Sequence, residues 1–413
     1  MHHSGSRTVG NSPAVTPGSG LFTPHKDQPA DDYESPETPG TYASPFLHFT
    51  HRVPPKETHV ADVDFDPITG RKLINHYEII DELGRGTHGK VKLGRDLQDE
   101  NTHVAIKIVE RYSKRRKLGK IVSAAEDKVK KEVAILKKAR HPNIVALLEV
   151  IDDPTRKKVY IVLEWVERGE IKWREKGPKE IAMRLANEIL DSDLNPDLEY
   201  VPVMTIQQAR VAFRDTLLGL QYLHYQGIVH RDIKPPNLLA TAEHRVKISD
   251  FGVSYLGRPL RDGEDGEEEL AKTVGTPGFF APELCITDPG DDPLPVTKSI
   301  DIWALGITLF CMLFARCPFV DSEYVVMRQI ADEEVYIPRK RLVPVDVKPA
   351  SRPSSHGRSY TPSTPSDRRN PLDLVYEDID DTLYDLLRRL LTKDPRKRIT
   401  LEEVRHHAWV VAD

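Results

Sequence analysis

The chain has 413 residues, 39% of them hydrophobic and 30% charged, which excludes both a membrane protein and a wholly disordered chain. A formal net charge of −5 gives no whole-chain case for a nucleic-acid partner. The three cysteines are too few for a disulfide framework, and the N-terminus lacks the apolar core of a signal peptide. The longest apolar run, from Ile302 to Phe314, would reach about 20 Å as a helix, which is short of the roughly 30 Å of a membrane core. We therefore expect a cytoplasmic protein with no membrane partner.

Residues 1–70 are expected to form a disordered tail. Pro, Ser, Thr and Gly dominate this segment and apolar periodicity is absent, so it cannot offset the entropy lost on ordering. Ser/Thr-Pro pairs begin at Ser12, Thr16, Thr23, Ser35, Thr38 and Ser44. The tail is either a linker or a target for proline-directed phosphorylation.

A packed domain is predicted to begin at Tyr77. β-Branched and aromatic residues predict strands at 77–83, 91–95, 104–109 and 159–163, and a helical pattern near 124–140 interrupts them. Helical patterns prevail after residue 205, and the apolar run 302–314 predicts a buried helix. Strands followed by helices indicate an α+β fold with a small and a larger lobe. Acidic residues 186–204 and Pro-, Ser- and Arg-rich residues 341–371 are expected to be surface insertions.

A glycine-rich segment lies between the first two of these strands. Glycines let a backbone approach phosphates without Cβ clashes, and backbone N–H groups can point at anionic oxygens. The strand–turn–strand setting differs from the strand–turn–helix of a dinucleotide fold. By itself the segment does not identify a phosphate site. Its residues are Leu83, Gly84, Arg85, Gly86, Thr87, His88, Gly89, Lys90 and Val91.

Lys107 lies in an apolar strand, where an unpaired charge would be costly to bury. A carboxylate partner is therefore expected on the helix that follows. Glu132 is flanked on one face by Val129 and Leu136 and is the favoured partner; Glu126 lies on a different face.

Three further motifs follow in a fixed order. The first runs from His230 to Leu239 (HRDIKPPNLL), the second is Asp250-Phe251-Gly252, and the third is Ala281-Pro282-Glu283. Together with the glycine-rich segment and Lys107, the chain from 77 to 410 resembles the eukaryotic protein kinases. The resemblance implies a bilobal protein-kinase fold, with a β-rich N-lobe at 77–166, a helical C-lobe at 167–410, and ATP held between them.

The resemblance also implies roles for particular residues. Lys107 would contact the α- and β-phosphates of ATP and pair with Glu132, while Asn237 and Asp250 would hold Mg²⁺. Asp232 would orient the substrate hydroxyl and accept its proton, with Lys234 beside the transferred phosphate. The remaining nucleotide contacts would come from the gatekeeper Leu163, the hinge residues Glu164 and Val166, Glu170, and the residues on either side of the adenine, Val91, Ala105 and Leu239.

Supporting residues follow from the same resemblance. Thr276 in Gly275-Thr276-Pro277 would help hold Asp232 and Lys234, which is typical of serine/threonine kinases. Asp301 would brace the catalytic loop from the buried helix. Glu283 would pair with Arg398, and losing one member of such a buried pair strands the other.

Within the kinases, the chain resembles the calcium/calmodulin-dependent kinase kinase group, and in it the fungal upstream activators of the AMP-activated (sucrose-non-fermenting) kinase. The stretches that carry this are 75–94, 169–173 and 273–285. The resemblance implies a protein substrate, namely the activation-loop threonine of another kinase. The alternatives are a morphogenesis or checkpoint kinase of the same group, and an ATP-binding scaffold acting through its tail and insertions.

Regulation is left open by the sequence. The usual activating phosphosite falls on Lys272. Either the acidic run 264–269 neutralises Arg231, or Thr273 is phosphorylated instead, or the run is a solvated acidic loop. A basic stretch at 111–120 is a solvated loop, a substrate dock or a nuclear import signal, and the last would add a nuclear location. The chain stops at Asp413 without a counterpart of the tail that binds calmodulin in animal relatives, so regulation lies elsewhere or the chain is truncated.

Overall fold

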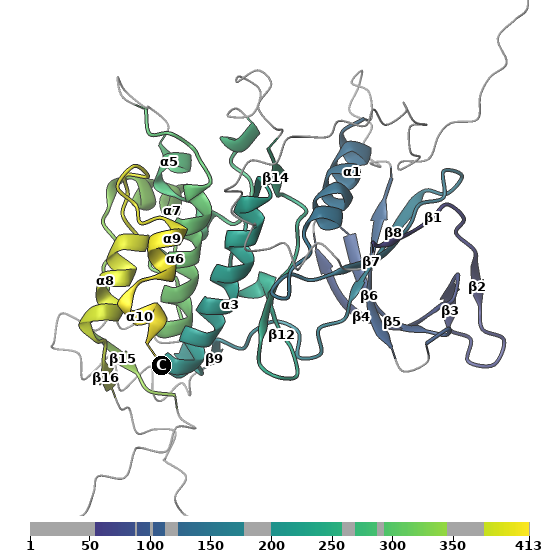
Figure 1. The fold of residues 1–413 in the computed structure, drawn as a ribbon, viewed down its shortest axis with the longest axis horizontal. Coiled ribbons are helices and arrows are strands. Elements are labelled where there is room, and N and C mark those ends of the chain that lie inside the picture. The colour runs from purple at the N-terminus through teal and green to yellow at the C-terminus, as the bar shows by residue number, and fades with distance from the viewer. Residues whose placement is uncertain are drawn as a thin grey trace, which may run out of the picture. The chain divides into compact units, whose positions relative to one another are not determined.

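The computed structural model describes residues 54–86, 89–99, 102–111, 123–176, 200–257, 269–286, 293–344 and 376–412. Their contacts divide them into two compact units (Figure 1). The first contains Pro55–Lys130 and Leu148–Val162, and the second contains Lys131–Leu147 and everything from Leu163 onward. Helix α1 (Ser123–Lys138) crosses this division. Within the described ranges, no helix is both long enough and apolar enough to cross a membrane.

An eight-stranded mixed sheet forms the first unit, in the order β1-β7-β8-β6-β5-β4-β3-β2. Its core is built from alternating apolar residues, among them Ile74, Val104, Ile106 and Val162, which are fully or almost fully buried. The strands are β1 (Lys56–Thr58), β2 (Val63–Phe65), β3 (Lys72–Ile74), β4 (Tyr77–Gly86), β5 (Gly89–Asp96), β6 (His103–Glu110), β7 (Leu147–Ile151) and β8 (Lys158–Glu164).

The N-terminal strands border both edges of this sheet. If the sheet were flat, its two outer strands, β1 and β2, would lie about 34 Å apart. Residues 59–62 join these strands, however, and the five residue steps from Thr58 to Val63 span at most about 18 Å. The sheet must therefore curl. Hydrogen bonds fix the connection, from Asp152 N to Thr58 O (2.8 Å), from Ala61 N to Asp153 Oδ2 (3.1 Å) and from Asn75 N to Asp62 O (2.8 Å).

These strands correct the expected boundary of the tail at residue 70. Strand β1 pairs in parallel with β7, and β2 pairs with β3, so residues from 56 onward belong to the sheet. The buried carboxylate of Glu149 on β7 holds this segment, because it accepts hydrogen bonds from Thr58 Oγ1 and Tyr77 Oη and pairs with Lys56. Burial and this carboxylate both raise the pKa of Tyr77. The predicted phosphorylation sites in the tail lie outside the described residues.

The second unit is mainly helical and is built around α6 (Ser299–Phe314), every residue of which is buried. Figure 1 shows α6 between α3 (Ile206–Tyr225) and α8 (Asp381–Leu390), and Gly306 permits the close approach of Leu390 and Leu391. The predicted buried helix at 302–314 is confirmed. The other helices among the described residues of this unit are α5 (Pro282–Cys285), α7 (Glu323–Asp332), α9 (Leu401–Arg405) and α10 (Ala408–Val411), with 3-10 turns η2 (Pro235–Asn237) and η3 (Pro277–Phe279).

Short two-stranded sheets complete the second unit. The hairpin of β12 (Leu238–Ala240) and β13 (Val246–Ile248) packs on α3. The other described strand pairs are β9 (Arg174–Lys176) with β10 (Tyr200–Pro202), β11 (Ile228–Val229) with β14 (Tyr255–Leu256), and β15 (Lys340–Leu342) with β16 (Tyr376–Asp378). Each expected insertion therefore includes strand residues near one end, because residues 200–202 and 340–342 pair with neighbouring strands. Residues 186–199 and 345–371 lie outside the described residues.

The division by contacts also differs from the lobe boundary expected at residue 166. Residues 131–147 belong to the helical unit because their backbone bonds to it: Tyr222 Oη donates to Lys138 O (2.9 Å), and Val145 N donates to Ile248 O (3.0 Å). Asn143 adds a bond from its side-chain amide to Val246 O (2.9 Å). A linear sequence pattern could not reveal these long-range partners.

Candidate active site

The glycine-rich segment connects β4 to β5 in the first unit, where Gly86 faces Gly89 and Gly84 faces Val91 across the strands. Gly89 has a φ of +141°, and an added Cβ would lie 2.5 Å from Ile108 O, so its fold requires glycine. At Gly84 and Gly86 an added Cβ would meet nothing within 4 Å. Internal packing therefore does not explain these two glycines, which leave room for an external group such as a phosphate. Thr87 and His88 lie outside the described residues.

Lys107 occupies the middle of β6 and is 7% exposed, as expected for a buried cation on an apolar strand. It faces Val91 on β5, and Ala105 faces Leu93. The first unit thus brings Lys107, Ala105 and Val91 together beside the glycine-rich segment. Glu132 belongs to the second unit, so the pairing of Lys107 with Glu132 stays a prediction.

The carboxylate of Asp232 is the centre of the second unit's polar cluster. Thr276 Oγ1 donates to its Oδ1 (2.8 Å), and Lys234 Nζ lies 2.7 Å from its Oδ2. Lys234 also donates to Thr276 Oγ1 (2.6 Å), which closes the ring of contacts. Charge-assisted bonds of this kind are stronger and more directional than neutral ones, so the carboxylate is held in one orientation. The contacts expected of Thr276 are confirmed.

Asn237 links Asp232 to the β12–β13 hairpin. Both of its amide protons are used, since Nδ2 donates to Asp232 O (2.8 Å) and to Asp232 Oδ2 (2.9 Å). Its side-chain oxygen is the atom left to meet a cation. Asn237 directly precedes β12 and Asp250 follows β13 after one residue, and Ser249 N donates to Asn237 O (2.9 Å), so both side chains begin at the same end of the hairpin. Carboxylate and amide oxygens suit Mg²⁺, and the pair fits such an ion.

The backbone here adopts conformations that L-residues rarely use. Arg231 and Asp250 have φ values of +66° and +59°. Such strain persists only where surrounding contacts impose it, and it gathers at functional sites. At Arg231 the imposing contacts come from Asp301 of α6, whose carboxylate accepts hydrogen bonds from His230 N and Arg231 N at 2.8 Å each. The predicted brace from the buried helix is confirmed.

Two histidines contribute contacts that the sequence pattern did not predict. His230 Nδ1 accepts from Asp232 N (3.3 Å), its Nε2 lies 3.0 Å from Ser249 O, and its ring meets Phe251 edge-on. His224 Nε2 lies 2.9 Å from Asp301 Oδ2. Burial alone would raise the pKa of Asp301, but the bonds from His224 and the His230 backbone hold it below its usual value. The spacing of the two histidines in the sequence carries no signal of these contacts. The contact of His224 with Asp301 arises where α3 packs on α6.

The expected hinge residues lie beside the same hairpin. Glu170 forms an isolated antiparallel bridge with Leu239, and Ile171 N donates to Leu238 O (2.9 Å). Val166 is buried, whereas the Glu164 carboxylate accepts from Ala146 N (2.7 Å) and pairs with Lys247 (2.9 Å). The Glu164 side chain is thus occupied internally, and its backbone N–H donates to Ala146 O (2.9 Å).

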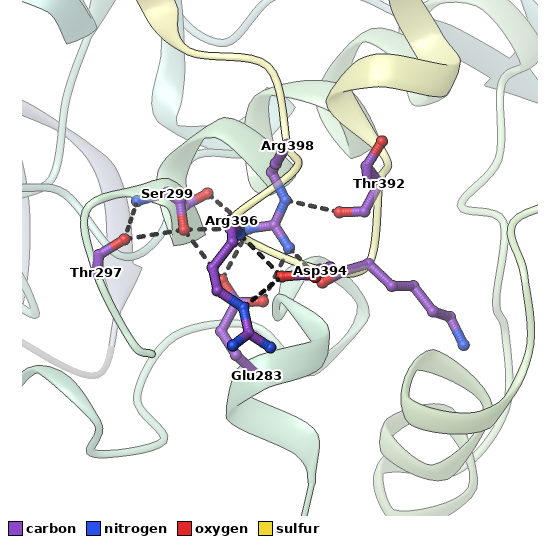
Figure 2. Close-up of polar contacts among 8 residues, drawn as sticks. Glu283, Thr297, Ser299, Thr392, Asp394, Arg396 and Arg398 are labelled. Atoms are coloured by element: carbon purple, nitrogen blue, oxygen red, sulfur yellow. Dashed lines mark hydrogen bonds and ion pairs between the residues drawn. The ribbon is translucent and has the colours of Figure 1, made fainter. Parts of the chain in front are cut away.

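Glu283 and Arg398 form a buried ion pair, shown in Figure 2, with neither side chain exposed. Arg398 Nη1 and Nη2 donate to the two carboxylate oxygens at 2.8 and 2.9 Å. The remaining donors of Arg398 reach backbone oxygens of Ser299, Thr392 and Lys393. The predicted pairing is confirmed, and every charge in it is compensated.

Comparison with known proteins agrees with this geometry. The family model described as protein kinase domain matches residues 77–410. The chain therefore belongs to the protein kinase family. It is 48% identical over 359 residues to the serine/threonine-protein kinase ssp1 of Schizosaccharomyces pombe, covering 86% of this chain and 46% of that protein.

Two further relatives carry more specific names. The SNF1-activating kinase 1 of Saccharomyces cerevisiae is 38% identical, with 87% of this chain and 30% of that protein covered. A calcium/calmodulin-dependent protein kinase kinase of Caenorhabditis elegans is 33% identical, with 82% and 53% covered. The chain thus spans about half or less of the length of these relatives. The resemblance to this group of serine/threonine kinases is confirmed.

Gly275→Ala is expected to lower the phosphoryl-transfer rate by about a hundredfold, the cost of a misplacement of roughly 1 Å. Gly275 has a φ of +122°, and an added Cβ would lie 2.6 Å from Arg231 O and 3.4 Å from Asp232 Oδ1. The substitution would therefore displace the catalytic loop. Initial rates of labelled-phosphate transfer measure the effect. Gly278→Ala is the matched control, because an added Cβ there meets nothing within 4 Å; equal rates for the two variants would contradict the prediction.

Proposed function

We propose that the chain is an ATP-dependent serine/threonine protein kinase that phosphorylates the activation-loop threonine of a downstream kinase of the AMP-activated type. The arrangement around Asp232 carries the chemical part of this proposal. A carboxylate held by Lys234, Thr276 and Asn237 is positioned to orient a hydroxyl and take its proton. The cytoplasm is the proposed location, as the sequence predicts.

The proposed reaction uses the chain's residues as follows. Asp232 accepts the hydroxyl proton as the acceptor oxygen forms a bond to the γ-phosphorus, and the bond from that phosphorus to the β–γ bridging oxygen breaks, so that ADP leaves. The ammonium of Lys234 offsets negative charge on the transferred group. Lys107 and the glycine-rich segment would hold the phosphates of ATP, and Asn237 and Asp250 would hold magnesium. When bound, magnesium neutralises charge on the phosphates. Catalysis is thus mainly positioning and electrostatic stabilisation, which the fixed cluster supports.

The choice of acceptor rests on the relatives. One is named a SNF1-activating kinase and another a calcium/calmodulin-dependent protein kinase kinase, and both names describe kinases that act on kinases. Pro236 supports it from within the chain, because many kinases that read substrate arginines carry a glutamate at this position. A folded activation loop, rather than a basic peptide, is the acceptor that this absence favours.

In the test, the purified chain is incubated with Mg²⁺, labelled ATP and, as the substrate, a catalytically inactive kinase of the AMP-activated type. One sample carries the activation-loop threonine and a matched sample carries alanine there. We expect label on the first protein and at most background on the second. Equal labelling of both would refute the choice of acceptor. Failure to label these and every general serine/threonine substrate would refute kinase activity and favour the scaffold alternative.

A further inference from the structure

Glu269 lies at the centre of a cluster of cations from three segments of the helical unit. Its Oε1 lies 3.1 Å from Lys131 Nζ of α1 and 3.8 Å from Arg231 Nη2 of the catalytic loop. Lys272, from the same segment as Glu269, donates to Oε2. Of the acidic run 264–269, Glu269 alone lies within the described residues.

Arg231 needs a compensating partner because its side chain is only 6% exposed. Arg231 Nε donates to Val253 O (2.6 Å) and Nη1 donates to Glu269 O (2.8 Å), so Glu269 serves it through both backbone and carboxylate. Burial lowers the pKa of Arg231, and the charge of Glu269 acts against this. Without the carboxylate, Arg231 and Lys131 would repel each other across a partly buried space.

The negative charge at this position is permanent. The hydrogen bond from Lys272, followed by that from Lys131, lowers the pKa of Glu269 to about 2. The carboxylate is therefore ionised at every pH at which the chain would work. A phosphate ester on the same segment would supply similar charge-assisted bonds, but only after modification by another enzyme.

Arg231 links the cation cluster around Glu269 to the catalytic loop that bears Asp232. Arg231 directly precedes Asp232, holds a φ of +66°, and its carbonyl oxygen faces Gly275. Lys131 directly precedes Glu132, the residue expected to pair with Lys107. One carboxylate thus connects the helix that bears Glu132 to the loop that bears Asp232.

We propose that Glu269 is a positioning residue whose fixed charge holds Arg231 and Lys131 together, so that the kinase works without phosphorylation of its activation segment. This inference rests on the proposed kinase function. It decides between the two alternatives that the sequence leaves open, in favour of the acidic run and against Thr273. Thr273 is exposed to solvent, which would allow its modification. The cations that a phosphate on Thr273 would neutralise, however, are already paired with the Glu269 carboxylate.

The test compares Glu269→Gln, which keeps the shape and removes the charge, with Glu269→Asp, which keeps the charge. Glu269→Gln should lower kcat by about tenfold to a hundredfold while the KM for ATP changes less than twofold, and Glu269→Asp should recover part of kcat. Glu402→Gln is the matched control, because it removes a similar charge from an exposed pair with His406. Thr273→Ala and phosphatase-treated wild type should keep the wild-type rate.

Hydrogen exchange supplies a second readout that does not depend on activity. Glu269→Gln should speed exchange in both 131–138 and 230–237, and Lys131→Met should speed it in the helix alone. Unchanged kcat and exchange in Glu269→Gln, or loss of activity in Thr273→Ala or after phosphatase, would overturn the inference. Wild type without any kinase activity would overturn the proposed function instead, and the exchange pattern would still decide whether Glu269 connects the two segments.

Discussion

Asp232→Asn is expected to reduce the rate of phosphoryl transfer by about 10²- to 10⁴-fold, the usual contribution of a general base. The amide keeps the size of the side chain but removes its negative charge and its basicity. It also disturbs the local hydrogen bonds. Asn237 Nδ2 and Lys234 Nζ both approach Oδ2 of the carboxylate, and an uncharged amide accepts hydrogen bonds from these two donors less well. The fold should persist, since Asp301 still holds the loop backbone.

Initial rates of label transfer to a serine/threonine substrate measure this loss. Thermal unfolding followed by circular dichroism checks that the variant is folded. Asp381→Asn is the matched control, because its carboxylate is 96% exposed and pairs with Arg339 at the surface; it should keep the wild-type rate. A folded Asp232→Asn variant with a rate within threefold of wild type would contradict the proposed role.

Glu283→Leu is expected to lower the free energy of unfolding by about 3–5 kcal/mol, the typical cost of stranding one charge of a buried pair. Arg398 would remain fully buried without the two bonds to the carboxylate, and the backbone oxygens around it carry only partial charge. Ser299 Oγ would also lose its bond to Glu283. Urea unfolding followed by circular dichroism measures the change.

The double variant Glu283→Leu/Arg398→Met separates a charge effect from a packing effect. Because it removes both charges and leaves apolar groups of similar length, it should recover most of the loss. The position of Arg398 beside the Trp303 ring favours an apolar replacement there. If the double variant were less stable than Glu283→Leu, or if the single change cost less than 1 kcal/mol, the account of the pair would be wrong.

Local motifs were predictable because their chemistry is carried by residues close together in the sequence. Asp232, Lys234 and Asn237 lie within six positions, and a turn and a hairpin are enough to bring them together. The buried helix α6 was also predictable, since a continuous apolar run of that length is typical of a helix that is covered on all sides. The β-rich character of residues 77–110 followed from strand patterns of ordinary length.

The N-terminal strands could not be predicted because tertiary pairing determines them. Strands β1 and β2 have three residues each, and both follow Pro-rich or acidic sequence that favours disorder. What orders them is distant: β7 pairs with β1, and Glu149 collects the bonds of Thr58 and Tyr77. Composition measured over a window cannot detect a partner about ninety positions away.

The choice of one carboxylate from the acidic run was equally beyond the sequence. The pattern left open whether a member of 264–269 neutralises Arg231 or Thr273 is phosphorylated instead, and the acidic members of the run share the same chemistry. Glu269, the member of the run that the structure describes, lies 3.1 Å from Lys131 on α1, and that proximity arises from the packing of segments far apart in the chain. The charge pattern therefore offered this interaction as one alternative, and the described contacts place Glu269 beside Arg231.

The most direct test of the central claim is a crystal structure of the chain bound to Mg²⁺ and a non-hydrolysable ATP analogue. The proposed mechanism predicts Lys107 Nζ within hydrogen-bonding distance of the α- and β-phosphates, side-chain oxygens of Asn237 and Asp250 on the metal, and Asp232 facing the γ-phosphate. A nucleotide bound elsewhere, or Lys107 and Asp250 on separate faces with no nucleotide between them, would contradict it.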